Sequence, residues 1–293
     1  MINKENLKKV LDFLEFTHRK EIYTYKNTIL GYTIVVDFAG KGKITYPDGV
    51  IVNDETTSNL TKNENFVVLE CVYRLLKLGY KPECIELEPK WEAPHDIGGG
   101  GKADVLVKDN AGESFLLIEC KTWGKEFDNY WKKTEQDGDQ LFFYAVQKRS
   151  TKYLCMYASN WDNDELVRKS NIISLKDNTA TLESFDEPIS FEKANDKSSL
   201  FAAWNITYGK YSFKNGIFED TCIPYLIEEK GRDISNITEI GHDDIQKKYH
   251  EFTTILRQHN VSGRENAFDK LVNLFLAKIV DEIRNSDKLQ FYW

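Results

Sequence analysis

The stretch KADVLVKDNAGESFLLIECKTW, residues 102–123, decides the fold of this 293-residue chain. An apolar run lies on each side of the tetrapeptide DNAG at 109–112, and a short turn of this composition between two such runs is typical of a β-hairpin. Side chains alternate between the two faces of a strand. Glu119 and Lys121 therefore project from one face, about 7 Å apart along the strand. The pattern predicts a hairpin that carries a carboxylate and an ammonium side by side.

The segments around this hairpin predict its neighbours in the fold. ENFVVLECVYRLLKLGY (64–80) has apolar residues at helical spacing, with Asn63 expected as its cap and Gly79 at its end. DGDQLFFYAVQKR (137–149), with Asp137 or Asp139 as cap, predicts a second helix, and KYLCMYAS (152–159) a further strand. The order helix, hairpin, helix, strand predicts an α/β core with a mixed sheet flanked by helices.

Weaker patterns precede and follow this core. A short amphipathic helix is expected over 4–17, and strands over 28–38 and 44–52, where Pro-Asp-Gly marks a turn. Shorter strands are expected near 171–175 and 181–185. These elements precede and follow the predicted core in the sequence.

The chain is expected to divide into three parts. Residues 1–186 form the α/β domain, 187–240 are irregular in pattern and predict a connector or small subdomain, and 241–293 predict a helical segment. Within the last part, 243–258 and 264–285 have helical patterns, and the second is strongly amphipathic.

Composition excludes several classes of protein. Hydrophobic residues make up 41% and charged residues 29% of the chain, which argues against general disorder. No apolar run approaches the roughly 20 residues of a membrane-spanning helix, and the amino terminus lacks a secretory signal, so no membrane partner is expected. Five Cys without a CxxC pair predict a reducing, cytoplasmic location. With a net charge of −8, DNA binding would need a local basic groove.

A third charged residue, Asp104, lies in the first strand of the predicted hairpin. Antiparallel pairing brings Asp104 close enough to Glu119 to share one cation, and oxygen ligands favour Mg²⁺ over zinc. Lys121 could then hold or help to deprotonate the attacking water. Two structural alternatives stay open: Glu119 and Lys121 form an ordinary ion pair, and Asp104 caps the glycine run at 98–101.

These residues resemble the active site of the PD-(D/E)XK nuclease superfamily, in which an Asp on one strand precedes E-x-K on the next. Ala103 stands where the family usually has Pro. The resemblance implies a restriction-endonuclease-like fold and a Mg²⁺ ion, replaceable by Mn²⁺, held by Asp104, Glu119 and the main-chain carbonyl of Cys120. It implies that Lys121 orients the attacking water.

Two helices extend the resemblance. Gln140 and Tyr144 match the QxxxY helix of the exonuclease and type I restriction-subunit branches, and i, i+4 spacing puts both on one helix face. The resemblance implies that they contact the phosphate backbone or fix the catalytic Glu; an ordinary amphipathic helix is the alternative. Glu70 matches an acidic helix position of the family that reaches toward the metal, although a salt bridge to Arg74 explains it equally well.

Over residues 28–160 and 262–293 the chain is similar to the amino-terminal nuclease region of restriction–modification proteins. That region is related to type I restriction R subunits and is fused to N6-adenine DNA methyltransferases. The resemblance implies that the chain is the amino-terminal fragment of a longer protein, with methyltransferase and target-recognition regions in the same or a partner chain. The sequence has no GxxxxGK[ST] motif and no methyltransferase motif, which predicts neither an ATP site nor an S-adenosylmethionine site.

The expected function is Mg²⁺-dependent endonuclease cleavage of double-stranded DNA, with Lys102, Lys125, Gln140 and Tyr144 as DNA contacts. Cutting both strands needs two active sites and so suggests a homodimer. The basic residues near the motifs are Lys90, Lys102, Lys121, Lys125, Lys132, Lys133, Lys148, Arg149 and Lys152. Two alternatives are a non-catalytic module that binds DNA or docks on a methyltransferase complex, and a helical platform for the methyltransferase formed by residues 241–293.

Overall fold

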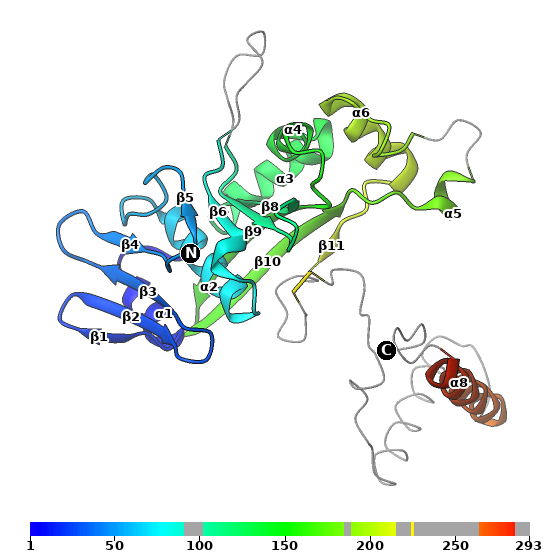
Figure 1. Cartoon of the computed structure of the whole chain (residues 1–293), viewed down its shortest axis with the longest axis horizontal. Coiled ribbons are helices and arrows are strands. Elements are labelled where there is room, and N and C mark those ends of the chain that lie inside the picture. The colour runs from blue at the N-terminus through cyan, green and yellow to red at the C-terminus, as the bar shows by residue number, and fades with distance from the viewer. Residues whose placement is uncertain (91–101, 185–188, 215–223, 226–263, 285–293) are drawn as a thin grey trace. The chain divides into compact units, whose positions relative to one another are not determined.

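The computed structural model (Figure 1) describes residues 1–90, 102–184, 189–214, 224–225 and 264–284. The chain divides into two compact units, Met1–Tyr225 and Leu226–Trp293. In the second unit the described residues form α8 (Arg264–Arg284), which confirms the helix expected over 264–285. The expected helix over 243–258 lies outside the described residues, and the three-part division of the chain stays a prediction.

A seven-stranded mixed sheet forms the centre of the first unit. Its strand order is β11 (Phe213–Lys214), β10 (Glu165–Ser174), β9 (Tyr153–Asp162), β8 (Ser114–Cys120), β7 (Val105–Lys108), β6 (Ile85–Leu87) and β5 (Ile51–Val52). β8 pairs with β9, and β5 with β6, in parallel, whereas the other neighbours are antiparallel. All seven residues of β8 are buried, as expected for a strand in the middle of a sheet covered on both faces.

Helices cover both faces of this sheet (Figure 1). Leu117, Leu154 and Met156 pack against α3 (Lys125–Asp137) and α4 (Asp139–Gln147) on one face. The alternate residues of β8 and β9 face the other way, where α2 (Asn63–Lys77) contacts both strands. The protein is therefore a mixed α/β structure, as the sequence predicts.

The chain before α2 forms a second, four-stranded antiparallel sheet. Its strands are β1 (Thr17–Arg19), β2 (Ile22–Asn27), β3 (Tyr32–Asp37) and β4 (Lys43–Thr45). The strand expected over 28–38 begins only at Tyr32, because the Asn27 side chain accepts hydrogen bonds from the backbone N–H groups of Ile29 and Leu30 and so closes a turn. The two strands expected within 44–52 exist, but β4 joins this sheet and β5 joins the other.

The remaining elements are short. They are α1 (Leu7–Phe13), the 3-10 turn η1 (Pro82–Cys84), α5 (Thr179–Leu182), α6 (Lys197–Ala202) and the π-helical turn η2 (Ala203–Thr207). The strand expected near 181–185 is wrong, because Asn178 caps a helical turn there by accepting a hydrogen bond from Thr181 N–H. Trp204 of η2 packs on Phe142 of α4 with the centres of the two rings 5.4 Å apart, so this segment contributes to the core of the first unit.

Two of the expected helix caps differ from the structure. Asn63 is the first residue of α2 and Lys62 is its cap, while Gly79 ends the helix in the left-handed conformation (φ +99°), as expected. Gly138, also left-handed at φ +83°, separates α3 from α4 and stands where Asp137 or Asp139 was expected as cap. No described helix has both the length and the apolar composition that crossing a membrane would require.

Candidate active site

The β7–β8 hairpin has the predicted geometry. The two strands pair antiparallel with Val105 opposite Ile118, and the Asp109 side chain accepts hydrogen bonds from the backbone N–H groups of Ala111 and Glu113 in the turn. Asp104 lies directly before β7, and its Oδ2 accepts a hydrogen bond of 2.7 Å from the backbone N–H of Cys120. The Asp104 carboxylate is therefore held against the last residue of β8.

Lys121 lies between two carboxylates at the end of β8. Its Nζ is 2.7 Å from Oε1 of Glu119 and 2.9 Å from Oε1 of Glu64, and it lies 4.6 Å from the centre of the Tyr130 ring. Lys121 and Glu119 are 6% and 4% exposed, so both charges are almost completely removed from water. The Glu119–Lys121 ion pair that was one alternative exists, but Lys121 also pairs with Glu64.

Two buried side-chain oxygen atoms, one in the site and one in α4, have no hydrogen-bond partner among the described residues. They are Oε2 of Glu119 and Oε1 of Gln140 in α4. A buried acceptor left without a partner costs free energy, so such atoms are rare in folded proteins unless a ligand or ordered water completes them. The oxygen of Glu119 therefore indicates a place for a cation or a hydrogen-bond donor beside this residue.

The electrostatics of the site favour a bound cation. Burial, and then the charge of Glu119, raises the pKa of Asp104 well above its usual range. Burial raises the pKa of Glu119 to about 7, although the nearby Lys121 opposes the shift. Burial alone would lower the pKa of Lys121, but the carboxylates of Glu119, Asp104 and Glu64 outweigh it and raise this pKa. Asp104 and Glu119 thus repel each other and retain protons that a divalent cation would displace.

The stability of the metal-free protein should depend on pH through Glu119. Its folded pKa of about 7 lies above its usual value of 4.5, so between these two values the folded protein holds a proton that the unfolded chain releases. The free energy of unfolding should therefore fall as pH rises through this window, by on the order of 2–3 kcal/mol.

Urea denaturation in EDTA at pH 5 and pH 7.5 measures this effect, with Glu119→Gln as the reference that lacks the titrating group. The advantage of the wild type over Glu119→Gln should shrink at the higher pH. Parallel pH profiles for the two proteins would show that Glu119 has an ordinary pKa.

The donor set fits Mg²⁺ better than a transition metal. Within the described residues, no three or more His, Cys, Asp or Glu side chains form a group that could hold a metal ion. The set that the resemblance implies, two carboxylates and the Cys120 carbonyl, stays a prediction. The Cys120 thiol is buried and contacts Cys71 of α2, on the other face of the sheet from Glu119, and so is not a ligand. Oxygen-only ligands, few in number, suit an ion that keeps several of its own waters.

Tyr144 and Gln140 share the face of α4 that approaches the site. Tyr144 is 2% exposed, and its hydroxyl donates a 3.0 Å hydrogen bond to the backbone carbonyl of Lys102. Burial, and then the charges of Glu119 and Asp104, raises the pKa of this hydroxyl. The structure thus brings Tyr144 near the two acids, while the role of Gln140 and the contacts of both residues with DNA stay predictions.

The side chain of Glu70 forms its hydrogen bonds with two described residues other than Arg74, the ion-pair partner that the sequence suggests. Its side chain is 1% exposed, with Oε2 at 2.5 Å from the Tyr157 hydroxyl and Oε1 at 2.7 Å from Nε of Arg168. The acid of α2 that reaches the candidate site is Glu64, in the first turn of the helix. Sequence reasoning missed Glu64 because an acidic residue there is also explained by the helix dipole.

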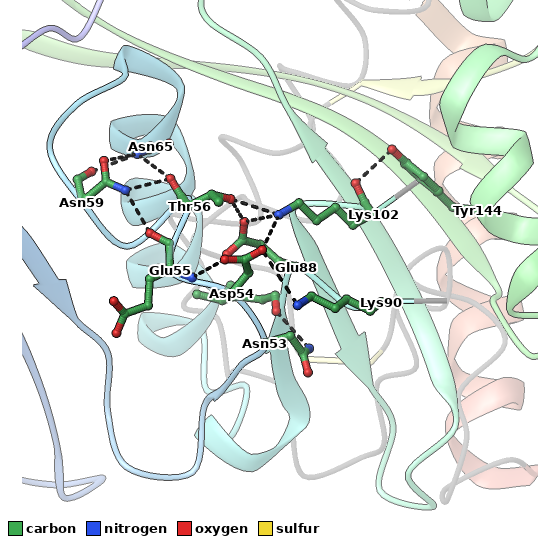
Figure 2. Close-up of polar contacts among 11 residues, drawn as sticks. Asn53, Asp54, Glu55, Thr56, Asn59, Asn65, Glu88, Lys90, Lys102 and Tyr144 are labelled. Carbon is green, nitrogen blue, oxygen red and sulfur yellow. Dashed lines mark hydrogen bonds and ion pairs between the residues drawn. The ribbon is translucent and has the colours of Figure 1, made fainter. Parts of the chain in front are cut away.

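The two lysines expected as DNA contacts have different surroundings. Lys125 begins α3. Lys102 is surrounded by Asp54, Thr56 and Glu88 (Figure 2), so its ammonium is already bound within the protein. The glycine run at 98–101 lies outside the described residues, so the alternative in which Asp104 caps this run stays open.

No family model matches the chain, and no curated protein matches its sequence.

Proposed function

We propose that this chain is a Mg²⁺-dependent deoxyribonuclease whose α/β core has a restriction-endonuclease-like fold. The observation that carries the proposal is the meeting of three groups at the end of β8: Asp104 against Cys120 N–H, Glu119 with a free buried oxygen, and Lys121 bridging Glu119 and Glu64. An ordinary structural ion pair explains Lys121 but supplies no partner among the described residues for the buried Oε2 of Glu119.

The acids and the lysine have separate roles in this proposal. Asp104, Glu119 and the Cys120 carbonyl would hold the ion. When bound, Mg²⁺ lowers the pKa of water and neutralises charge that develops on the phosphate. An ammonium has three N–H donors, and Glu119 and Glu64 accept two of those of Lys121. In this proposal the third donor would orient the attacking water or a phosphate oxygen.

The raised pKa of Lys121 in the metal-free protein favours one of two roles for this residue. A lysine acts as a general base only after it loses its proton, and the surrounding carboxylates oppose that loss. Lys121 therefore acts as a positive donor that positions the nucleophile and stabilises negative charge. Glu64 keeps it protonated and in place.

Double-stranded DNA is the proposed substrate, and a restriction–modification system is the proposed setting, with methyltransferase and target-recognition regions as partners and a homodimer for cutting both strands. These proposals rest on the resemblance of the motifs to that group of proteins. The acidic chain would need local basic residues to bind DNA, because its net charge of −8 repels the phosphates.

Incubation with supercoiled plasmid tests the proposed activity. With Mg²⁺ or Mn²⁺ the chain should nick or linearise the plasmid, and EDTA should stop the reaction. Lys169→Ala, which removes an exposed lysine paired with Asp128, is the control for a general loss of positive charge and should cleave like the wild type. DNA binding without cleavage under all these conditions would favour the non-catalytic module instead.

A further inference from the structure

A second charged cluster, here called the Glu88 cluster, includes Lys102, two residues before Asp104 (Figure 2). It consists of Asp54, Thr56, Glu88 and Lys102. The ammonium of Lys102 is 3.1 Å from Oδ2 of Asp54, 3.1 Å from Oγ1 of Thr56 and 3.0 Å from Oε1 of Glu88. These three oxygens match the three N–H donors of an ammonium, so the donors of Lys102 are all used. Lys102 is therefore poorly placed to contact DNA in this arrangement.

Glu88 has an unusual backbone and an unusual environment. Its φ is +50°, in the left-handed region that residues other than glycine rarely adopt. Its side chain is 1% exposed, and Oε2 has no hydrogen-bond partner among the described residues. Such a conformation persists only where the surrounding structure holds it, and it is frequent at functional sites.

Glu88 is connected directly to the backbone of Asp104. The N–H of Glu88 donates a 3.0 Å hydrogen bond to the carbonyl of Asp104, just beyond the last paired residues of β6 and β7. The left-handed backbone lets one residue do two things: its N–H holds Asp104 while its carboxylate turns toward Lys102. An extended residue at this position would continue the alternation of the strand instead.

Lys102 completes the connection from the other side. Its carbonyl accepts the hydrogen bond of Tyr144, and its ammonium is held by Glu88. The backbone from 102 to 104 is thus held at its first residue by Tyr144 and at its last by Glu88, and the Glu88–Lys102 ion pair joins the two ends. Asp104 then extends its carboxylate to Cys120 N–H.

We propose that Glu88 and Lys102 are positioning residues: their ion pair fixes the backbone of Asp104 so that its carboxylate meets the end of β8. The functional part of this inference rests on the proposed nuclease activity, since Asp104 is there a ligand of the metal. Groups that orient metal ligands typically change metal affinity or activity about 10- to 100-fold when they are replaced.

The experiment compares Glu88→Gln and Lys102→Met with Glu86→Gln. Glu86 is the matched control, because it lies in β6 two residues before Glu88 and its ion pair with Lys108, at 2.6 Å, joins β6 to β7. Three quantities are measured: kcat and KM for plasmid cleavage, the Kd for Mn²⁺ by calorimetry, and the Kd for DNA by fluorescence anisotropy in EDTA. Both test variants should lower kcat and weaken Mn²⁺ binding by about tenfold or more, with KM and the DNA Kd nearly unchanged, while Glu86→Gln should behave like the wild type.

A fourth quantity does not depend on metal or on activity. In metal-free protein labelled with [¹⁵N]cysteine, the amide proton of Cys120 reports the hydrogen bond to Asp104, and the Cys120→Ala variant assigns its signal. Glu88→Gln and Lys102→Met should both move this signal upfield, because the bond to Asp104 lengthens, and Glu86→Gln should leave it in place.

Each outcome separates the two proposals. If the wild type cleaves DNA but both test variants match Glu86→Gln, the positioning role is wrong and the nuclease assignment stands. If the wild type neither cleaves nor binds Mn²⁺ and yet the Cys120 signal moves, the positioning stands and the activity is wrong. Weaker DNA binding by Lys102→Met at unchanged kcat would make Lys102 a DNA contact and overturn the inference. If Glu88→Gln does not fold, Lys102→Met alone tests the inference. This variant should fold, because the side chain of Lys102 is partly exposed.

Discussion

Replacing Lys121 by Ala is expected to lower the rate of Mg²⁺-dependent plasmid cleavage about a thousandfold while the protein stays folded. The substitution removes the ammonium that bridges Glu119 and Glu64 and that would orient the attacking water. The fold should survive because Glu119, whose pKa is already raised to about 7, can take up a proton when its partner is lost. Initial rates of plasmid linearisation at saturating Mg²⁺ measure the effect.

Two controls make this result specific. Lys169→Ala removes an exposed lysine and should retain full activity. Circular dichroism and thermal unfolding of Lys121→Ala should show a folded protein, so that loss of activity is not loss of structure. Cleavage by a clean preparation of Lys121→Ala at near the wild-type rate would refute the proposed mechanism.

Replacing Glu70 by Ala is expected to have the largest effect on stability, lowering the free energy of unfolding by about 3–4 kcal/mol. Glu70 is 1% exposed, and both of its oxygens are engaged, by Tyr157 and by Arg168. Its removal leaves the guanidinium of Arg168, at 24% exposure of its side chain, without its carboxylate and leaves the buried hydroxyl of Tyr157 without its acceptor. Urea denaturation of the two proteins measures the difference.

The surface pair Lys8–Glu21 supplies the reference for this prediction. Its two side chains are exposed, so Glu21→Ala should lower the stability far less than Glu70→Ala, although the pair is nearly as close, at 2.8 Å. Once folded, Glu70→Ala should still cleave DNA. A variant that keeps its stability but loses cleavage would instead support the catalytic role that the sequence suggests for Glu70.

The hairpin and α2 were predictable from the sequence because their signals are local. Strand periodicity and the DNAG turn set the pairing of β7 with β8, and that pairing places Asp104 beside the end of β8. The acid of α2 that reaches the site was not predictable in this way. Glu64 and Glu70 are six residues apart, which is a rotation of about 240° around a helix, and the packing of α2 on the sheet decides which of them faces Lys121.

Other elements lack a local signal. α3 is rich in charged residues, and only Phe127, Trp131 and Thr134 of its thirteen residues are buried. These three have helical spacing, but so few buried residues within a charged stretch are easily overlooked in the sequence. The Glu88 cluster joins residues 14 to 48 positions apart along the chain. Its formation depends on the pairing of β5, β6 and β7, and no motif in the sequence marks Glu88 as a partner of Lys102.

The central claim is that Asp104 and Glu119 converge on one divalent ion. Crystals of the protein with Mn²⁺ and a short DNA duplex, measured at the manganese absorption edge, test it most directly. The account predicts an anomalous peak within ligand distance of carboxylate oxygens from both Asp104 and Glu119, with Lys121 beside it. A manganese peak elsewhere, with Glu119 still bound only to Lys121, would contradict it.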